Sequence, residues 1–281
     1  MSTSPDQIKQ IRQAILSTAI RGRLVCQNAE DEVASRLLAR INENSTTIAV
    51  PNLPDDEKPY AIPPTWKWVR FGQLITASDA GWSPQSESFP RSANNWGVLK
   101  VSAVSWDRFL PEENKQLLPE TTPPEQAKVH AGDFLISRAN TSELVAKCVV
   151  VDQEPVKLIL SDKIVRLQIA APCSKNFLSI VNNHAEYARA YYAEQASGTS
   201  FSMKNVSRAV IYSLPIPLPP EAEQLRIVAK VDELMSLCDQ LETQLTATQT
   251  ESSRLLDAVL HQALKADEEM LASIGEATSC A

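Results

Sequence analysis

The sequence predicts an α+β fold, in which one globular domain of mixed helices and strands lies between N-terminal helices and a long C-terminal helix of coiled-coil type. Three observations predict it. Residues 1–43 show helical periodicity, residues 66–218 alternate between short apolar runs and turn residues, and residues 221–274 contain neither Gly nor Pro. We therefore expect five segments: N-terminal helices at 1–43, a proline-rich linker at 44–65, the domain at 66–218, the long helix at 219–266 and an acidic tail at 267–281.

Two helices are expected in the N-terminal segment. In residues 5–24, isoleucines recur at steps of three and four, and Gly22 stands where a C-terminal cap is needed. Asn28 is placed to cap a second helix with an acidic first turn at residues 30–32. The buried stripe of that helix consists of Val33, Leu37 and Ile41.

From Trp66 onward, the hydrophobic pattern changes from helical periodicity to short runs. Apolar or alternating runs predict strands at 98–103, 133–137, 144–151, 156–160 and 164–169. One helix is predicted at 176–197, because its apolar residues share one face and Gly198 follows it.

The C-terminal helix begins after a proline-rigid run at 214–220. Its heptad positions step by four and three: Ile227, Val231, Leu234, Cys238, Leu241, Leu245, Thr248, Ser252, Leu255 and Val259. Such a seam is typical of a long helix that packs along another helix. An ordinary core helix is the other interpretation, but a helix this long cannot be buried on all sides in a compact domain.

Charge is distributed unevenly along the 281 residues, although the net charge is −7. Residues 66–214 carry 16 Lys and Arg against 14 Asp and Glu, whereas residues 215–281 carry 4 against 12. Phosphate binding depends on the local surface, so the acidic helix does not exclude a nucleic-acid partner for the middle. The five cysteines lack CxxC spacing, the N-terminus lacks a signal-type apolar core, and no apolar run reaches 18 residues. We expect reduced thiols, a cytoplasmic location and no membrane span.

Motifs for catalysis are missing from the sequence. There is no GxGxxG, GxxxxGK[ST] or GxSxG, the three histidines are isolated, and the Asn-Pro-Pro-aromatic signature of base methylation does not occur. The pair Glu154 and Lys157 has the wrong spacing for a nuclease and encloses a proline. We therefore expect no catalytic residue, no metal and no cofactor.

Polar stretches suited to binding remain. One stretch, 138–142, follows a predicted strand, a second, 161–163, precedes another strand, and a third, 196–205, follows the predicted helix. The candidate DNA-contacting residues in these stretches are Arg138, Asn140, Thr141, Ser142, Lys163, Thr199, Ser200, Lys204 and Asn205. Arg can read guanine, Asn can read adenine, and Ser, Thr and Lys can hold phosphates. Ordinary turn chemistry accounts for the same residue types, and composition alone favours it.

A family resemblance decides between these interpretations. The string Pro217-Leu-Pro-Pro-Glu-Ala-Glu-Gln-Leu-Arg-Ile-Val228 resembles a segment of the specificity subunit of type I restriction–modification systems, and so does Arg21-Gly-Arg-Leu-Val25. The segments 62–69, 132–138 and 198–206 resemble the entry and motifs of a target-recognition domain in that family. The resemblance covers nearly the whole chain in the family's order.

The resemblance implies a non-enzymatic reader of double-stranded DNA that serves DNA methylation and phage defence. In that family two recognition domains each read half of a split site, and long helices set their spacing and dock the methylation subunits, which work with the restriction subunits. The helix residues expected to dock a partner are Gln224, Ile227, Val231, Leu234, Cys238, Leu241 and Leu245. Two alternatives remain: a scaffold or decayed fragment that docks methylation subunits without reading DNA, and a stand-alone nuclease or methyltransferase, for which no motif exists.

This chain departs from the family's pattern in length, because it has room for one recognition domain. It is expected to be either a half-length subunit or a fragment of a longer one. A half-length form would pair with a second copy of itself, and an echo between residues 13–21 and 257–265 fits that arrangement, as does the polar step at Thr248 and Ser252. In addition, Glu221 stands where the family often has an apolar residue, and Ala146 where it often has Gly.

Overall fold

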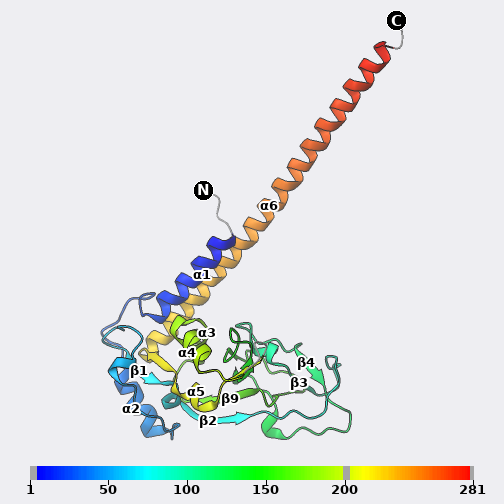
Figure 1. The fold of residues 1–281 in the computed structure, drawn as a ribbon. Coiled ribbons are helices and arrows are strands. Elements are labelled where there is room, and N and C mark those ends of the chain that lie inside the picture. Colours follow the sequence, from blue (N-terminus) through cyan, green and yellow to red (C-terminus); the bar gives the residue numbers. More distant parts are fainter. Residues whose placement is uncertain (1–4, 199–202, 279–281) are drawn as a thin grey trace. The chain divides into compact units, whose positions relative to one another are not determined.

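The computed structural model describes residues 5–198 and 203–278, and it confirms the α+β prediction (Figure 1). The chain divides into two units. One unit is Ile15–Val231, and the other combines Met1–Ala14 with Asp232–Ala281. Each unit is described separately below.

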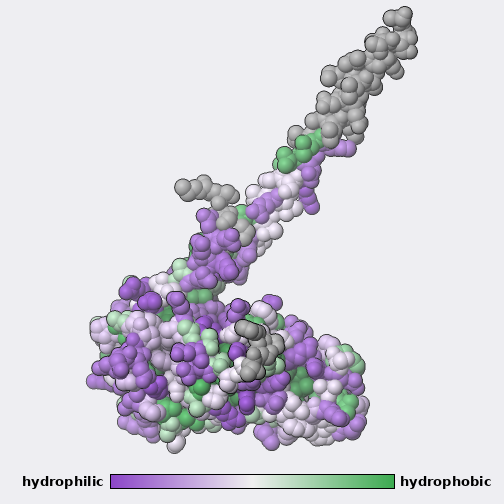
Figure 2. All heavy atoms as spheres, in the orientation of Figure 1, coloured by the Kyte–Doolittle hydropathy of each residue, from purple (hydrophilic) through white to green (hydrophobic). Residues whose placement is uncertain are grey.

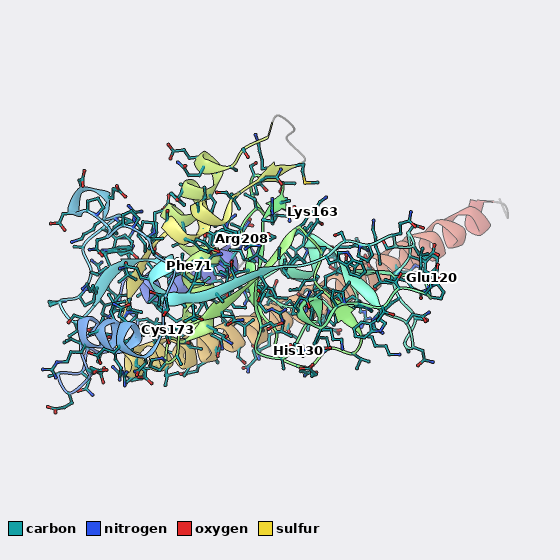
Figure 3. The ribbon with its side chains drawn as sticks, turned by 90° about the horizontal axis from the view of Figure 1, so that it is seen from below. Phe71, Glu120, His130, Lys163, Cys173 and Arg208 are labelled. Carbon is teal, nitrogen blue, oxygen red and sulfur yellow. The ribbon has the colours of Figure 1, made fainter. Side chains whose placement is uncertain are left out.

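Two sheets form the centre of the Ile15–Val231 unit. The larger sheet is antiparallel, in the order β2 (Ile75–Ala80), β9 (Ile164–Ile169), β5 (Phe134–Ser137) and β7 (Cys148–Val150). The smaller sheet has the order β4 (Asn114–Gln116), β3 (Gly97–Leu99) and β8 (Leu158–Ile159), with β3 and β8 parallel. Phe71 packs edge to face with Phe134, the first residue of β5, and the ring centroids are 6.0 Å apart (Figure 3 labels Phe71).

Two short antiparallel pairs complete the strands. The first joins β1 (Lys67–Arg70) to β11 (Pro215–Leu218), with Lys67 opposite Leu218. The second joins β6 (Ala139–Asn140) to β10 (Lys204–Asn205). Four 3₁₀ helices lie between strands or in the linker: η1 (Asp55–Glu57), η2 (Phe71–Leu74), η3 (Val101–Val104) and η4 (Glu125–Ala127).

The N-terminal helices are α1 (Pro5–Ile20) and α2 (Ala34–Asn44). Gly22 follows α1 with a φ of 69°, which confirms the predicted cap, because glycine adopts this left-handed conformation without steric cost. The predicted cap at Asn28 is wrong. Its side-chain oxygen instead accepts the N–H of Glu30 at 3.1 Å, which is a local turn, and α2 begins after Val33.

The predicted helix at 176–197 is in fact two helices, α3 (Lys175–His184) and α4 (Glu186–Gln195). Ala185 separates them with an extended ψ of 122°. The apolar pattern did not show the break, because Phe177 and Val181 of α3 and Tyr192 of α4 are all buried. Residues 144–147, predicted as part of a strand, form a turn before β7. A short helix, α5 (Arg208–Ser213), precedes β11.

The longest helix, α6 (Glu221–Thr278), has 58 residues. In the second unit, the first residues of α1 lie beside it. Arg12 forms ion pairs with Asp239 at 2.6 Å and Glu242 at 3.0 Å, and Ile8 and Cys238 are buried. Further along α6, four leucines are exposed: Leu241, Leu255, Leu256 and Leu260. Figure 2 shows hydrophobic residues on the exposed part of the helix. None of the described helices has both the length and the apolar character needed to cross a membrane.

Candidate nucleic-acid interface

The fold brings most of the candidate DNA-contacting residues together at the ends of four strands. The N–H of Arg138, just after β5, donates to the carbonyl of Lys163 at 2.9 Å, in the turn before β9. Across the β6–β10 pair, Asn140 lies opposite Lys204, and Asn205 lies opposite Ala139. Thr141 and Ser142 follow β6 directly and are partly exposed, whereas Thr199 and Ser200 lie outside the described residues.

Two cations in this cluster are available for a ligand. The side chains of Arg138 and Lys163 are exposed, and within the described residues neither forms a hydrogen bond or ion pair (Figure 3 labels Lys163). The ammonium of Lys204 donates to the carbonyl of Gly198 at 2.6 Å. Because phosphates and guanine edges are strong acceptors, Arg138 and Lys163 are the two candidates best prepared to bind DNA.

The amide of Asn140 is already engaged. Its nitrogen donates to the hydroxyl of Ser105 at 2.9 Å, and its oxygen accepts the N–H of Thr141 at 2.9 Å. Bidentate reading of adenine needs both groups, so the side chain would first have to leave these partners. The geometry therefore gives Asn140 a role in holding its loop.

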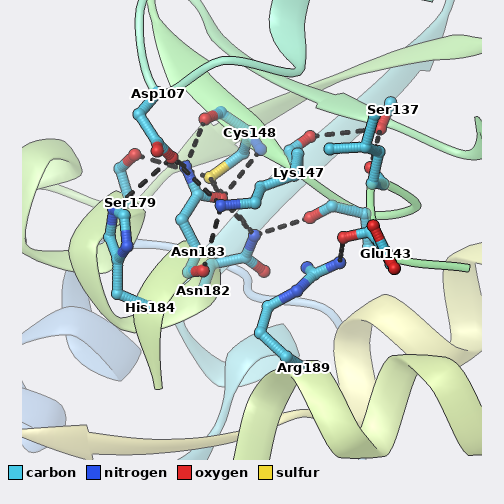
Figure 4. Close-up of polar contacts among 12 residues, drawn as sticks. Asp107, Ser137, Glu143, Lys147, Cys148, Ser179, Asn182, Asn183, His184 and Arg189 are labelled. Atoms are coloured by element: carbon cyan, nitrogen blue, oxygen red, sulfur yellow. Dashed lines mark hydrogen bonds and ion pairs between the residues drawn. The ribbon is translucent and has the colours of Figure 1, made fainter. Parts of the chain in front are cut away.

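The loop after β6 is held from below by α3 and α4 (Figure 4). Asn182 donates to the carbonyl of Ala146 at 2.7 Å, and Arg189 donates to the carbonyls of Glu143 and Val145 at 2.9 and 2.6 Å. Ala146 has a φ of 59° in this loop. That conformation is strained for any residue with a Cβ, which gives a physical reason for the glycine that the related family often has there.

A buried amide also completes the edge of the larger sheet. The side-chain oxygen of Asn183 accepts the N–H of Cys148 at 3.0 Å, and its nitrogen donates to the carbonyl of Cys148 at 2.8 Å and to Asp107 at 2.9 Å. Asp107 also lies 3.2 Å from the ammonium of Lys147 and 3.4 Å from the imidazole of His184. The network ties the segment around Asp107 to the β-sheet (Figure 4).

Burial sets the titration of the groups in this network. It raises the pKa of the Cys148 thiol to about 12 and lowers the pKa of His184, with Asp107 acting in the opposite direction on the histidine. A thiol so shifted is inert at neutral pH. Across the described parts of the chain, no group of three or more His, Cys, Asp and Glu side chains is arranged to hold a metal ion.

Two exposed tryptophans near the cluster were not among the predicted site residues. Trp82 is 39% exposed, its backbone N–H donates to the carbonyl of Leu160, and the next residue, Ser83, is hydrogen-bonded to Asp162. Trp106 is 56% exposed and follows Ser105, the partner of Asn140. The sequence contained a signal for this exposure, because each tryptophan stands between small or polar residues, in Gly81-Trp-Ser83 and in Ser105-Trp-Asp107.

The predicted partner-docking residues of α6 divide into two groups. Gln224, Ile227 and Val231 are buried within the Ile15–Val231 unit. The amide of Gln224 accepts the N–H of Ser174 at 2.8 Å and donates to the carbonyl of Pro219 at 3.0 Å, so it fixes the start of the helix. The remaining residues are on the part of α6 in the other unit, where Cys238 is buried, Leu234 and Leu245 are partly buried and Leu241 is 46% exposed.

These features define a class of protein: a binding module with basic and amide groups at its strand ends and a long helical extension. No family model matches the chain. It is 35% identical over 274 residues to the type I restriction enzyme EcoEI specificity subunit of Escherichia coli, an alignment that covers 93% of this chain and 46% of that protein. It is 24% identical over 286 residues to the EcoAI specificity subunit of the same species, with the same coverage.

The chain is therefore homologous to the type I restriction enzyme specificity subunits, as the sequence motifs predicted, and it spans about half the length of the curated relatives it matches. A chain from the solved structure named "Structural basis underlying complex assembly and conformational transition of the type I R-M system" shares the fold, with a TM-score of 0.51 at 18% identity. That likeness covers 89% of this chain and 53% of the other.

Proposed function

We propose that this chain is a non-catalytic DNA-recognition subunit, or the corresponding part of one, in a type I restriction–modification complex. It directs methylation and restriction subunits to one half of a split DNA site. The 35% identity to the EcoEI specificity subunit over 93% of the chain carries the proposal. The two unpaired cations at the strand ends support it, because a duplex offers acceptors at its phosphates and at guanine edges.

Arg138 and Lys163 have different tasks in this proposal. A planar guanidinium can bond to guanine O6 and N7 together, whereas an ammonium acts as a point charge toward phosphate. The hydroxyls of Thr141, Ser142, Thr199 and Ser200 would add phosphate contacts that fix the register on the duplex. The acidic α6 faces protein partners, so its charge does not oppose binding.

The part of α6 from Leu241 onward is the proposed docking surface for the methylation subunits and for a second copy of the chain. Leu241 and Leu255, which stand two heptads apart, are 46% and 59% exposed. Leucines repeated along a helix are the usual seam for a partner helix, and their burial there would contribute about 1.5–3 kcal/mol each.

Specific DNA binding tests the reading role. The target motif is first read from the methylation pattern of genomic DNA in cells with and without the gene. The complex with the methylation subunits is then titrated with a duplex that carries the motif and with a scrambled duplex. Tighter binding to the motif that weakens with salt is expected. A complex that assembles but binds both duplexes equally would favour the alternative, a scaffold that does not read DNA.

Arg138→Ala separates base contact from phosphate contact. If Arg138 reads guanine, the loss is about 1–3 kcal/mol and confined to the motif duplex. If it holds a phosphate, both duplexes weaken and the salt slope falls by about one. Arg36→Ala is the matched control, because it removes the same charge from an exposed position on α2. Unchanged affinity in Arg138→Ala would show that the reading face lies elsewhere.

Self-association tests the role of α6. The double substitution Leu241→Glu and Leu255→Glu places charges on the seam and is expected to lower the mass of the isolated chain measured by light scattering, if two copies pair through it. Gln240→Glu, at an exposed neighbouring position, is the control. An isolated chain that is monomeric before substitution would contradict pairing but not docking of the methylation subunits.

A further inference from the structure

Trp106 is the most exposed of the five tryptophans, at 56%. Trp82 is 39% exposed, Trp96 is partly buried, and Trp66 and Trp68 are 6% and 7% exposed. An indole ring left in water forgoes a large apolar burial. A ligand that covers the ring would recover the lost contact.

The segment that carries Trp106 is fixed on both sides. Before it, Ser105 donates to the carbonyl of Val101 at 2.6 Å. After it, Asp107 has a φ of 60° and its carboxylate is held by Lys147, Asn183 and His184 (Figure 4). The left-handed conformation at Asp107 persists because these partners over-determine it. The indole is therefore presented with little backbone freedom left to lose on binding.

The position of this segment relates it to the candidate reading face. Ser105 accepts a hydrogen bond from Asn140, and Asn140 lies opposite Lys204 in the β6–β10 pair. Two residues after Trp106 the chain continues to Arg108, which is exposed. The residue before the exposed ring thus contacts the strand pair that carries Asn140 and Lys204. Proteins combine aromatic rings with cationic and polar side chains to contact bases and phosphates together.

We propose that Trp106 is a specificity-determining residue that contacts the bases of the DNA by stacking at a base step, and that Asp107 is its positioning residue. The inference rests on the proposed DNA-reading function and adds a residue to it. An aromatic wedge at a base step gains stacking and reads how easily that step unstacks, so it contributes sequence preference without a hydrogen bond.

The test uses the complex with the methylation subunits and a duplex carrying the motif read from genomic methylation. Trp106→Ala is expected to weaken binding about tenfold, within the range for loss of one base–aromatic stack. The slope of affinity against salt is expected to stay constant, because no phosphate contact is lost. Trp106→Phe is expected to recover most of the affinity. Phe89→Ala is the matched control, because Phe89 is 50% exposed and its carbonyl accepts from Gln116 on β4 of the other sheet.

Asp107 is tested by coupling. Asp107→Ala is expected to lower affinity as Trp106→Ala does, and the double variant is expected to bind no worse than Trp106→Ala alone, because both changes remove one contact. Asp107→Asn keeps an acceptor for Lys147 and Asn183 and is expected to lose less. Additive losses in the double variant would show that Asp107 does not act through Trp106.

Each other result overturns the inference. Unchanged affinity in Trp106→Ala, an equal loss in Trp106→Phe, or a changed salt slope would each exclude stacking. Weaker assembly with the methylation subunits at unchanged DNA affinity would make Trp106 a protein contact. If the unsubstituted complex binds the motif and scrambled duplexes equally, both the proposed function and this inference are wrong. If the unsubstituted complex prefers the motif and Trp106→Ala binds it with unchanged affinity, only this inference is wrong.

Discussion

Removing the side-chain amide of Asn183 is expected to destabilise the domain more than most single substitutions. β7 is an edge strand of the larger sheet. The carbonyl of Lys147 accepts the N–H of Ser137, and the N–H of Val151 donates to the carbonyl of Asp133, so the backbone groups of both residues point toward β5. Since backbone groups alternate in direction along a strand, the N–H and carbonyl of Cys148 face away from β5, and Asn183 pairs both of them. The amide thus replaces the strand that the sheet lacks.

The magnitude follows from the two groups left unpaired. Each buried backbone group without a partner costs about 1–3 kcal/mol. Asn183→Ala is therefore expected to lower the free energy of unfolding by about 2–4 kcal/mol, because a water molecule can enter the space and bond to part of what is lost. Asn183→Leu has a similar volume and excludes that water, so its cost is expected to be higher than that of Asn183→Ala.

Urea unfolding followed by circular dichroism measures these differences. Asn176→Ala is the matched control, because Asn176 is exposed on the same helix and its loss is expected to stay within about 0.5 kcal/mol. A loss below about 1 kcal/mol in both Asn183 variants would refute the argument that the amide completes the sheet. A Leu variant as stable as the Ala variant would refute the part assigned to water.

Three further outcomes are expected. Ala146→Gly should leave the free energy of unfolding within about 1 kcal/mol, since relief of left-handed strain offsets the added freedom of the unfolded chain, whereas Ala146→Val should cost more than 2 kcal/mol in urea unfolding. Because burial lowers the pKa of His184, the unfolded state binds the proton first, so stability should fall as pH drops below about 6.5, and His184→Gln should reduce that fall in urea unfolding at pH 7.5 and 5.5. A thiol reagent at pH 8 should modify the exposed Cys26 but not Cys148 or Cys173, whose pKa values burial raises to about 12, until the protein unfolds, as read by mass spectrometry.

The sequence could predict those elements whose signal is local and repeated. Helix α6 was predictable because residues 221–274 lack Gly and Pro, and β9 because its residues are an unbroken apolar or alternating run. The start of α2 was missed because Asn28 bonds to Glu30 within a turn, which competes with capping. The break at Ala185 was missed because both neighbouring helices bury residues on one continuous pattern.

For the candidate site, the sequence supplied the residue types but not their partners. Arg138 and Lys163 could be chosen from their places beside predicted strands. That Asn140 lies opposite Lys204 could not be foreseen, because the pair is separated by a long stretch of chain and depends on tertiary structure. The exposure of Trp106 has the same origin. A tryptophan is more often packed than exposed, and only the structure shows that Trp106 is 56% exposed and precedes a residue in the left-handed conformation.

The break at Ala185 separates two helices that both bond to the loop between β6 and β7. Asn182 of α3 reaches the carbonyl of Ala146, while Arg189 of α4 reaches two other carbonyls of the same loop. Both contacts are made to main-chain oxygens, so they do not depend on which side chains the loop carries. The outward residues of the loop between β6 and β7 can therefore change, and with them the DNA contacts proposed for this loop, while the helices keep its backbone in place. Substitution of Thr141 or Ser142 should thus weaken DNA binding at little cost in stability, whereas loss of Asn182 should lower stability.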